Sequence, residues 1–385
     1  MLKTLSGLIV LLLVTLVQTS CNPLARGVFS KKTVREKYEE KLQKDSGKSN
    51  PVVNAWLNAA EYSLNNPLTI PPTYYEYGKF LATNQTATAL KVFVKRGQKL
   101  VVKLDKTSIQ PYAIYMDLWR AADSTTGKSL EYILAADTAI NKLEYIAAKD
   151  EKLIVRYQPQ LSSTGTYAIS ISPMPSFTFP VAASVKSNIG SFWGAGRDAG
   201  ARKHEGIDIF TVAKSPAVAV ADGVITSVSE NVLGGKVIFM QPDNSNYNVY
   251  YAHLDQQLVT SGQRVKAGEI IGLVGNTGNA KSTAAHLHFG IYTFNGAIDP
   301  LAFVEGTKAP APNFENKILN PAMVTTRQTK VYADLVTLLP IATLTKDIVL
   351  EAEAFSGKHY RILLPDGRKA FAEAKNLSVR KIKKI

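Results

Sequence analysis

Apolar and polar residues alternate with a period of two along much of the chain between Thr73 and Ser172. This alternation predicts strands with one buried face, and turn residues separate most of the segments. Short strands at regular spacing are typical of a sandwich or barrel, so we expect residues 73–172 to form an accessory β-sandwich. The expected strands are 90–95, 99–104, 112–118, 142–146, 152–157 and 165–171.

The residues before this region show a different pattern. Residues 30–47 are highly charged, which is typical of either a tether or a solvated helix. Between Pro51 and Asn65 the apolar residues recur near the helical spacing, which predicts a short helix that packs on another element. Pro67, Pro71 and Pro72 end this helix. We therefore expect residues 21–72 to form a tether with a short helix.

Two proline-rich segments divide the remaining chain into two further β-rich units. The first unit is expected over residues 177–305, and a linker over 306–323 leads to the last unit, 324–385, which ends in a basic tail. Short strands are expected in that last unit at 330–332, 347–354, 360–364 and 369–372, with a hairpin turn at Asp366-Gly367. The predicted fold class is mostly all-β.

The last unit resembles a bacterial SH3-like barrel. The resemblance rests on residues 358–361, on residues 365–368 and on Phe371, which stands where an aromatic residue is expected. This unit contains His359 but no cluster of metal-ligating residues, so we expect it to have no catalytic chemistry of its own.

The first twenty residues are typical of an export signal. Lys3 provides the positive start, and residues 8–17 are apolar apart from Thr15. Ten helical residues rise about 15 Å, which is too short for a bilayer core of about 30 Å. The only cysteine, Cys21, follows directly, so residues 1–20 resemble a bacterial lipoprotein signal in which Cys21 becomes the lipidated first residue. Gln18 departs from the leucine usual in that motif, and the alternative is a secreted protein with a stray thiol.

This resemblance implies a location. The protein is expected to be an exported lipoprotein at the periplasmic face of a cell membrane, held by a lipid anchor. Asn22 follows the cysteine, whereas an aspartate at this position is associated with retention in the inner membrane of Gram-negative bacteria. We therefore expect the outer membrane.

The composition narrows the classes of partner and metal site. Of the 385 residues, 45 are Lys or Arg and 31 are Asp or Glu, so the formal net charge is +14. Lysines are spread along the chain without an arginine-rich stripe or a basic and aromatic motif, so we expect no nucleic-acid partner. The charge fits a wall polymer, an anionic membrane or a general role in solubility. With one cysteine, any metal site must use histidine and carboxylate ligands. The sequence does not define the oligomeric state.

Four of the five histidines fall within residues 204–288. His204 and Asp208 are four residues apart, and on a strand both would point to the same face, with Gly206 between them leaving room for an ion. His286 and His288 would likewise share one face, with Leu287 in the core. His253 ends an expected strand over residues 248–252.

The residue types in this window suggest zinc chemistry. Two imidazoles and one carboxylate form a known catalytic zinc set that leaves a fourth position for water. Further histidines can then move protons and stabilise the charge that develops on the substrate.

The motifs in this window resemble those of the lysostaphin and LytM-type zinc endopeptidases. The resemblance spans residues 177–304, and it rests on five segments: His204 with Asp208, residues 251–254, 275–278, 286–289 and the closing Asp299-Pro300. It implies an antiparallel β-sandwich core whose groove holds one Zn²⁺. By the same resemblance His204, Asp208 and His288 are the metal ligands, and His253 and His286 are the catalytic histidines.

The roles of several other residues in this window are less specific. Glu205 is expected to face away from the site. Trp193, Tyr250 and Tyr251 either line the groove or fill the core, and Arg197 pairs either with a substrate carboxylate or with Asp198 or Asp222. Residues 281–285 form a longer and less glycine-rich approach to His286 than the family pattern has.

These observations predict a zinc-dependent endopeptidase that hydrolyses peptide cross-links of bacterial peptidoglycan. A zinc-bound water would be the nucleophile. The alternatives are a non-catalytic activator of wall amidases and a cell-wall anchoring protein in which the SH3-like unit has the main function. The intact set of histidines and aspartate favours the enzyme.

Overall fold

The computed structural model describes residues 31–380, except 48, 109–110, 124, 126, 198–199, 307–318 and 320–321. The predicted signal peptide, Cys21 and most of the basic tail lie outside the described residues. Among the helices of the described part, none combines the length and the apolar character needed to cross a bilayer.

Two helices lie at the start of the described chain. Helix α1 (Val34–Ser46) begins with a capping box, in which Thr33 and Glu36 each bond the other's backbone or side chain. Helix α2 (Pro51–Asn65) is capped by the Asn50 side chain. Its first residue is a proline, which is common at this position because no hydrogen bond within the helix is lost there. The predicted helix over 51–65 is confirmed, and of the two readings for residues 30–47 the helix is correct. Trp56 of α2 is 1% exposed and its indole nitrogen donates to the Pro159 carbonyl oxygen, so α2 packs on the following sheet.

A sandwich of two sheets follows, as the alternating pattern predicts. One sheet has the order β1-β3-β8-β5-β6, and in the facing sheet β2, β9, β4 and β7 are neighbours in that order. The pattern did not indicate β2 and β6. The bounds are β1 (Leu68–Thr69), β2 (Tyr74–Phe80), β3 (Thr88–Val94), β4 (Gln98–Thr107), β5 (Ile114–Arg120), β6 (Glu131–Ala135), β7 (Lys142–Ile146), β8 (Glu151–Pro159) and β9 (Gly165–Pro175).

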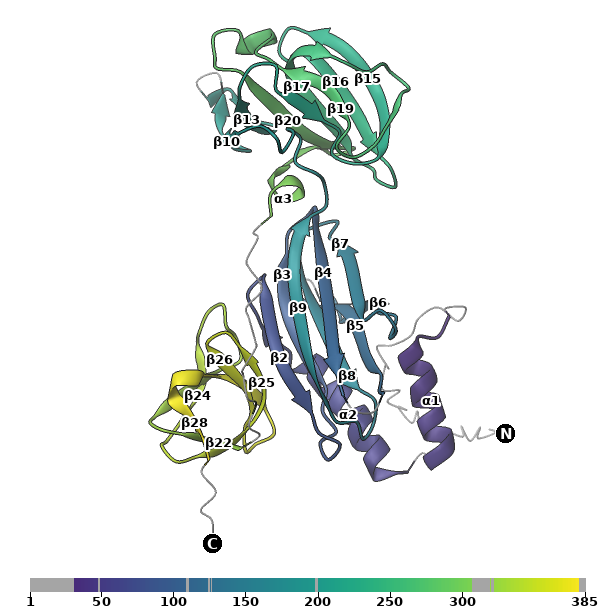
Figure 1. Ribbon diagram of the computed structural model, residues 1–385, viewed down its shortest axis with the longest axis vertical. Coiled ribbons are helices and arrows are strands. Elements are labelled where there is room, and N and C mark those ends of the chain that lie inside the picture. Colours follow the sequence, from purple (N-terminus) through teal and green to yellow (C-terminus); the bar gives the residue numbers. More distant parts are fainter. Residues whose placement is uncertain are drawn as a thin grey trace, which may run out of the picture.

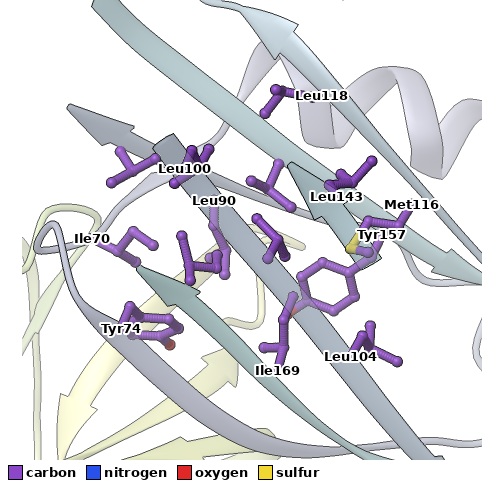
Figure 2. Close-up of a cluster of buried hydrophobic side chains, with 14 of the residues drawn as sticks. Ile70, Tyr74, Leu90, Leu100, Leu104, Met116, Leu118, Leu143, Tyr157 and Ile169 are labelled. Carbon is purple, nitrogen blue, oxygen red and sulfur yellow. The ribbon is translucent and has the colours of Figure 1, made fainter. Parts of the chain in front are cut away.

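The core of this sandwich is apolar side chains from both sheets. Leu90 of β3 and Leu118 of β5 are fully buried, and Leu100 of β4 and Ile169 of β9 come from the facing sheet. Figure 2 shows these side chains pointing toward one another between the strands. The alternation of apolar and polar residues in the sequence therefore determines which face of each strand is buried.

The middle unit is built on a ten-stranded antiparallel sheet. Its main path is β10-β13-β20-β17-β16-β15-β18, with β14, β19 and β21 attached to it. The bounds are β10 (Ser187–Ser191), β13 (Ile207–Thr211), β14 (Pro216–Val218), β15 (Gly223–Asn231), β16 (Gly235–Pro242), β17 (Asn248–Gln257), β18 (Arg264–Val265), β19 (Ile270–Val274), β20 (His286–Thr293) and β21 (Gly296–Ile298). A short hairpin, β11 (Gly196–Arg197) with β12 (Arg202–Lys203), lies between β10 and β13, and helix α3 (Leu301–Val304) ends the unit.

The C-terminal unit is also all-β and continues the sheet of the sandwich. Strand β25 pairs with β2, with Tyr77 opposite Phe355 and Gly78 opposite Ala354. One sheet therefore runs from the C-terminal unit into the sandwich, as Figure 1 shows for β2 and β25. The bounds are β22 (Ala322–Thr325), β23 (Thr329–Tyr332), β24 (Pro340–Leu344), β25 (Val349–Ser356), β26 (His359–Leu363), β27 (Lys369–Glu373) and β28 (Leu377–Val379). The SH3-like assignment of this unit stays a prediction.

A buried ionic network crosses the junction between these two units. Arg361 of β26 donates two hydrogen bonds of 3.1 Å to the carboxylate of Glu76 on β2, and it also bonds Glu353. The hydroxyls of Tyr157 and Tyr167 donate to the same Glu76 oxygen at 2.6 and 2.7 Å. Burial opposes the charge on Glu76, but Arg361 and the two hydroxyls outweigh it and lower the Glu76 pKa.

The middle unit is thus inserted between two parts that form one body. Its two connections lie side by side, because the backbone nitrogen of Phe177 donates to the Phe303 carbonyl oxygen at 2.9 Å. The ring of Phe303 also fills the space where a side chain on Gly97 would stand. In Figure 1 the middle unit lies beyond α3, at the end of the sandwich opposite to α1 and α2.

Substitution of Arg361 tests the junction. Arg361→Met leaves Glu76 buried without its cation, whereas Glu353 keeps its ion pair with Lys369 at 2.8 Å. Because an unpaired buried charge is costly, we expect the free energy of unfolding to fall by about 3–5 kcal/mol. Two of the three tryptophans, Trp56 and Trp119, are buried in α2 and the sandwich, so tryptophan fluorescence during urea unfolding reports on this body.

Arg264→Met is the matched control, because the ion pair of Arg264 with Asp243 is solvent-exposed. Its loss is expected to cost less than about 1 kcal/mol. Equal losses for the two variants would show that the network does not hold the units together.

Candidate metal centre

Three neighbouring strands place most of the predicted site. Asp208 of β13 lies directly opposite His288 of β20, and His288 lies opposite Ala252 of β17. Directly opposed residues project to the same face of a sheet, so Asp208 and His288 meet there. Leu287, between the two histidines of β20, is fully buried on the other face, as the spacing predicts.

His204 reaches the same point by a different route from the one expected. Strand β13 begins at Ile207, so His204 lies in the loop after β12 and the shared strand face proposed for His204 and Asp208 is wrong. The loop is fixed instead by backbone bonds, since the His204 nitrogen donates to the Ala195 carbonyl oxygen at 2.8 Å. Its ring nitrogen Nδ1 lies 2.9 Å from the Phe192 carbonyl oxygen.

Gly206 also has a different role from the one predicted. A Cβ atom at this position would lie 2.5 Å from the Phe289 carbonyl oxygen and 2.8 Å from the ring of His288. The glycine therefore makes room for the His288 imidazole and the neighbouring backbone, rather than for an ion.

Three potential ligand atoms converge in the resulting site. Asp208 Oδ1 lies 3.0 Å from His204 Nε2 and 2.9 Å from His288 Nδ1, and the two nitrogens are 3.0 Å apart. A tetrahedral zinc ion with bonds of about 2.0–2.1 Å separates its ligand atoms by about 3.3 Å. The three atoms therefore fit one zinc ion after a small outward movement.

The hydrogen-bond inventory shows why a cation suits this position. A carbonyl oxygen only accepts, so His204 Nδ1 carries a proton toward Phe192 and its Nε2 has a lone pair in the neutral ring. Burial opposes ionisation of Asp208, but its contacts with His204 and His288 outweigh burial and lower the Asp208 pKa. One proton on His288 Nδ1 cannot bridge all three pairs formed by Asp208 Oδ1, His204 Nε2 and His288 Nδ1. A cation between these three atoms would instead accept a lone pair from each of them.

His253 is aimed into the site by a strand irregularity. Its φ of 62° is left-handed, and the pairing of β16 with β17 changes register between Tyr251 and Leu254. A bulge of this kind redirects a side chain. Nδ1 of His253 lies 2.9 Å from the Thr277 carbonyl oxygen, so the proton is on Nδ1 and the lone pair on Nε2. Desolvation, with the neighbouring His286 and His288, lowers the pKa of His253 to about 4.

His286 is oriented in the same manner. Its Nδ1 lies 2.9 Å from the Ala284 carbonyl oxygen, which leaves the lone pair on Nε2. The rings of His253 and His286 pack edge to face with centroids 4.9 Å apart, and the ring of His253 is 5.9 Å from that of His288. Two further imidazoles, each with Nδ1 directed at a backbone carbonyl oxygen, thus stand beside the three convergent ligand atoms.

The motif at residues 275–278 supports this arrangement. The Thr277 hydroxyl donates to the Leu254 carbonyl oxygen at 2.9 Å and accepts from the backbone nitrogen of Lys236. Its carbonyl oxygen then orients His253. The motif therefore positions His253 through the backbone of Thr277, a role that the spacing of the residues alone did not indicate.

These side chains lie in a groove with a volume of about 770 Å³. Tyr250 lines it, whereas Tyr251 is fully buried and its hydroxyl accepts from the Val220 backbone nitrogen, which decides between the two readings of these tyrosines. Trp193 is not among the lining residues. Besides the site histidines and Asp208, the lining includes Ser191, Arg197, Arg202, Lys203, Glu205, Phe210, Asn231, Leu233, Phe239, Asn279, Thr283 and Tyr292.

Two predictions about charged residues are corrected. Glu205 lines the groove instead of facing away, and it raises the pKa of Tyr292, which burial brings to about 12. Arg197 pairs with Asp208, so the expected pairing with Asp222 is wrong, and Asp198 lies outside the described residues. Asp222 pairs with Lys266 instead. His359 lies on β26 of the C-terminal unit, outside the sheet that carries the site.

Comparison with known proteins identifies this part of the chain. Residues 202–300 match Peptidase family M23. The middle unit is therefore an M23 peptidase domain with relatives of the lysostaphin and LytM type, as the motifs predict.

Three relatives illustrate the range of this similarity. The glycyl-glycine endopeptidase ALE-1 of Staphylococcus capitis is 38% identical over 107 residues, which cover 26% of this chain and 29% of that protein. The L-Ala–D-Glu endopeptidase of Bacillus subtilis is 35% identical over 126 residues, covering 31% and 38%. The peptidoglycan DD-endopeptidase ShyC of Vibrio cholerae is 36% identical over 88 residues, covering 23% and 20%. The similarity thus covers less than two fifths of each relative.

The assignment of ligands and non-ligands can be tested by zinc content. His288→Ala removes one of three convergent atoms, so we expect the purified protein to lose its zinc on dialysis. His286→Ala leaves His204, Asp208 and His288 in place and is expected to keep one zinc per chain. The measurement is zinc stoichiometry by atomic absorption.

The two substitutions form a matched pair, since both remove one imidazole from the same face of β20. The reverse result, with zinc lost from His286→Ala and kept by His288→Ala, would exchange the roles of the two histidines.

Proposed function

We propose that the protein is a zinc metalloendopeptidase that hydrolyses peptide cross-links of bacterial peptidoglycan. The observation that carries the proposal is the convergence of His204, Asp208 and His288 beside His253 and His286, in the groove of an M23 domain. His204, Asp208 and His288 would hold the zinc ion. When bound, zinc supplies a water of lowered pKa and polarises the scissile carbonyl.

The two remaining histidines have the geometry of proton carriers. Nδ1 of each is committed to a backbone carbonyl oxygen, so Nε2 is the atom that faces a reacting group. With a pKa of about 4, His253 is unprotonated at neutral pH and can accept a proton from the attacking water. The proton can then pass to the amine that leaves. The imidazolium form would also stabilise negative charge on the carbonyl oxygen.

The charges at the groove favour an acidic substrate. Arg202 and Lys203 are exposed on its lining, and Glu205 is the acidic counterpart on the same hairpin and loop. Peptidoglycan stem peptides carry carboxylates, so these cations and the net charge of +14 would steer the polymer toward the site.

The names of the three relatives specify different bonds: glycyl-glycine, L-Ala–D-Glu and, for ShyC, the DD bond of peptidoglycan. We propose the cross-link between D-Ala and diaminopimelate for this protein, because the predicted signal is typical of a Gram-negative lipoprotein. Digestion of defined muropeptide dimers, followed by mass spectrometry of the fragments, distinguishes this bond from the L-Ala–D-Glu bond and from a glycyl bridge.

We further propose that the enzyme acts outside the cytoplasm, as an outer-membrane lipoprotein anchored through Cys21. Stable anchoring requires more than one acyl chain, which lipoprotein processing provides. Cys21→Ser is therefore expected to move the protein from the membrane fraction to the soluble extracytoplasmic fraction. Unchanged fractionation of this variant would contradict the lipid anchor while leaving the peptidase assignment intact.

Activity is tested with the histidines that do not contact the metal position. His253→Asn keeps a residue type that tolerates left-handed backbone, and it removes the base. We expect the turnover number on a cross-linked muropeptide dimer to fall by about 10² to 10⁴, the usual range for a general acid–base group. Zinc content is expected to stay at one per chain.

His359→Asn is the matched control, because His359 lies in the C-terminal unit. We expect it to retain wild-type turnover. A wild-type protein that holds zinc and yet cleaves neither dimers nor purified sacculi would support the non-catalytic alternative.

A further inference from the structure

The two oxygens of Asp208 have different partners. Oδ1 faces His204 Nε2 and His288 Nδ1, whereas Oδ2 accepts a hydrogen bond from Arg197 Nη2. The same guanidinium nitrogen donates to the Ser191 hydroxyl at 2.9 Å. That hydroxyl in turn lies 3.3 Å from His204 Nδ1. Arg197 therefore contacts one predicted ligand directly and a second one through Ser191.

We propose that Arg197 is a positioning residue for the metal centre. By occupying Oδ2, it keeps the Asp208 carboxylate turned so that Oδ1 alone points at the two histidine nitrogens. Without this contact the carboxylate could rotate, and Oδ1 would no longer be held in the direction of the two histidine nitrogens. Residues that orient metal ligands in this way commonly change metal affinity by about 10-fold to 100-fold.

The local backbone makes Arg197 suitable for this role. Arg197 lies on β11, paired with Arg202 on β12, directly before the loop that carries His204. The Gly194 nitrogen donates to the His204 carbonyl oxygen, and the His204 nitrogen to Ala195, so the hairpin and the ligand loop are joined. Ser191 stands opposite Asp208 in the pairing of β10 with β13. The guanidinium thus bridges two fixed segments.

Arginine has a chemical advantage over lysine here. Its planar group carries several donors with fixed directions and stays charged, whereas an ammonium is a point charge on a flexible stem. The Arg197 side chain is 34% exposed, so solvent weakens the contribution of this ion pair to folding stability. The value of the contact therefore lies in the orientation of Asp208.

Because Arg197 also lines the groove, binding of a substrate carboxylate is the competing role. The two roles make opposite predictions. A positioning residue changes the affinity for zinc in the absence of substrate, whereas a substrate-binding residue changes KM and leaves zinc binding unchanged.

The test compares Arg197→Met, Arg197→Lys and Ser191→Ala with Arg264→Met in the full-length protein. Arg264 is an exposed arginine of the same domain and pairs with Asp243 away from the site. The zinc dissociation constant is measured by competition with a chromophoric chelator. We expect Arg197→Met to weaken zinc binding by about 10-fold to 100-fold, the two other site variants to weaken it less, and Arg264→Met to match wild type.

Thermal unfolding of the metal-free variants separates this effect from misfolding. Metal-free Arg197→Met is expected to unfold at the wild-type temperature. If metal-free Arg197→Met unfolds at a lower temperature than wild type, the proposal is judged on Arg197→Lys and Ser191→Ala instead. Wild-type zinc affinity in both of these variants overturns the proposal. Wild-type zinc affinity with a raised KM in Arg197→Met also overturns it, in favour of substrate binding. Absence of zinc from the wild-type protein would instead refute the proposed function, on which this inference rests.

Discussion

The pairing of β13 with β20 is the constraint on which the site depends. It sets Asp208 opposite His288, and a shift of either strand by one residue would turn its own polar side chain to the buried face. Fully buried Ile209 and Leu287, which are also opposite each other, oppose such a shift because they would have to enter the groove. The apolar core thus fixes the relative position of the two polar side chains.

A second constraint holds the rest of the chain. Glu76 and Arg361 are 285 positions apart in sequence, yet they meet in the buried junction between the sandwich and the C-terminal unit. A buried ion pair adds little net stability, but either charge alone would be costly, so the pair specifies which surfaces join. The C-terminal unit is therefore a structural partner of the sandwich, and the peptidase domain is held at both of its ends by one body.

The sequence predicted the parts that depend on local patterns. Alternation identified most strands, and the i, i+2 spacing correctly placed His286 and His288 on one face. It failed where the geometry arises from distant segments. His204 lies in a loop that is fixed by Ala195, and the role of Gly206 depends on a ring from β20. The partner of Arg197 was missed because nothing in the spacing of Arg197 and Asp208 indicates that a hairpin folds back between them.

Three of the site histidines are oriented in the same way, by a hydrogen bond from Nδ1 to a backbone carbonyl oxygen. His204, His253 and His286 each place Nδ1 against a carbonyl oxygen, at Phe192, Thr277 and Ala284. All three rings therefore present Nε2, although they come from a loop, a bulge and the start of a strand. The Nε2 atom of His204 faces Asp208 and His288, the group that could hold a metal ion, whereas the Nε2 atoms of His253 and His286 lie outside that group. Under the proposed function the same tautomer therefore serves His204 as a ligand and His253 and His286 as proton carriers.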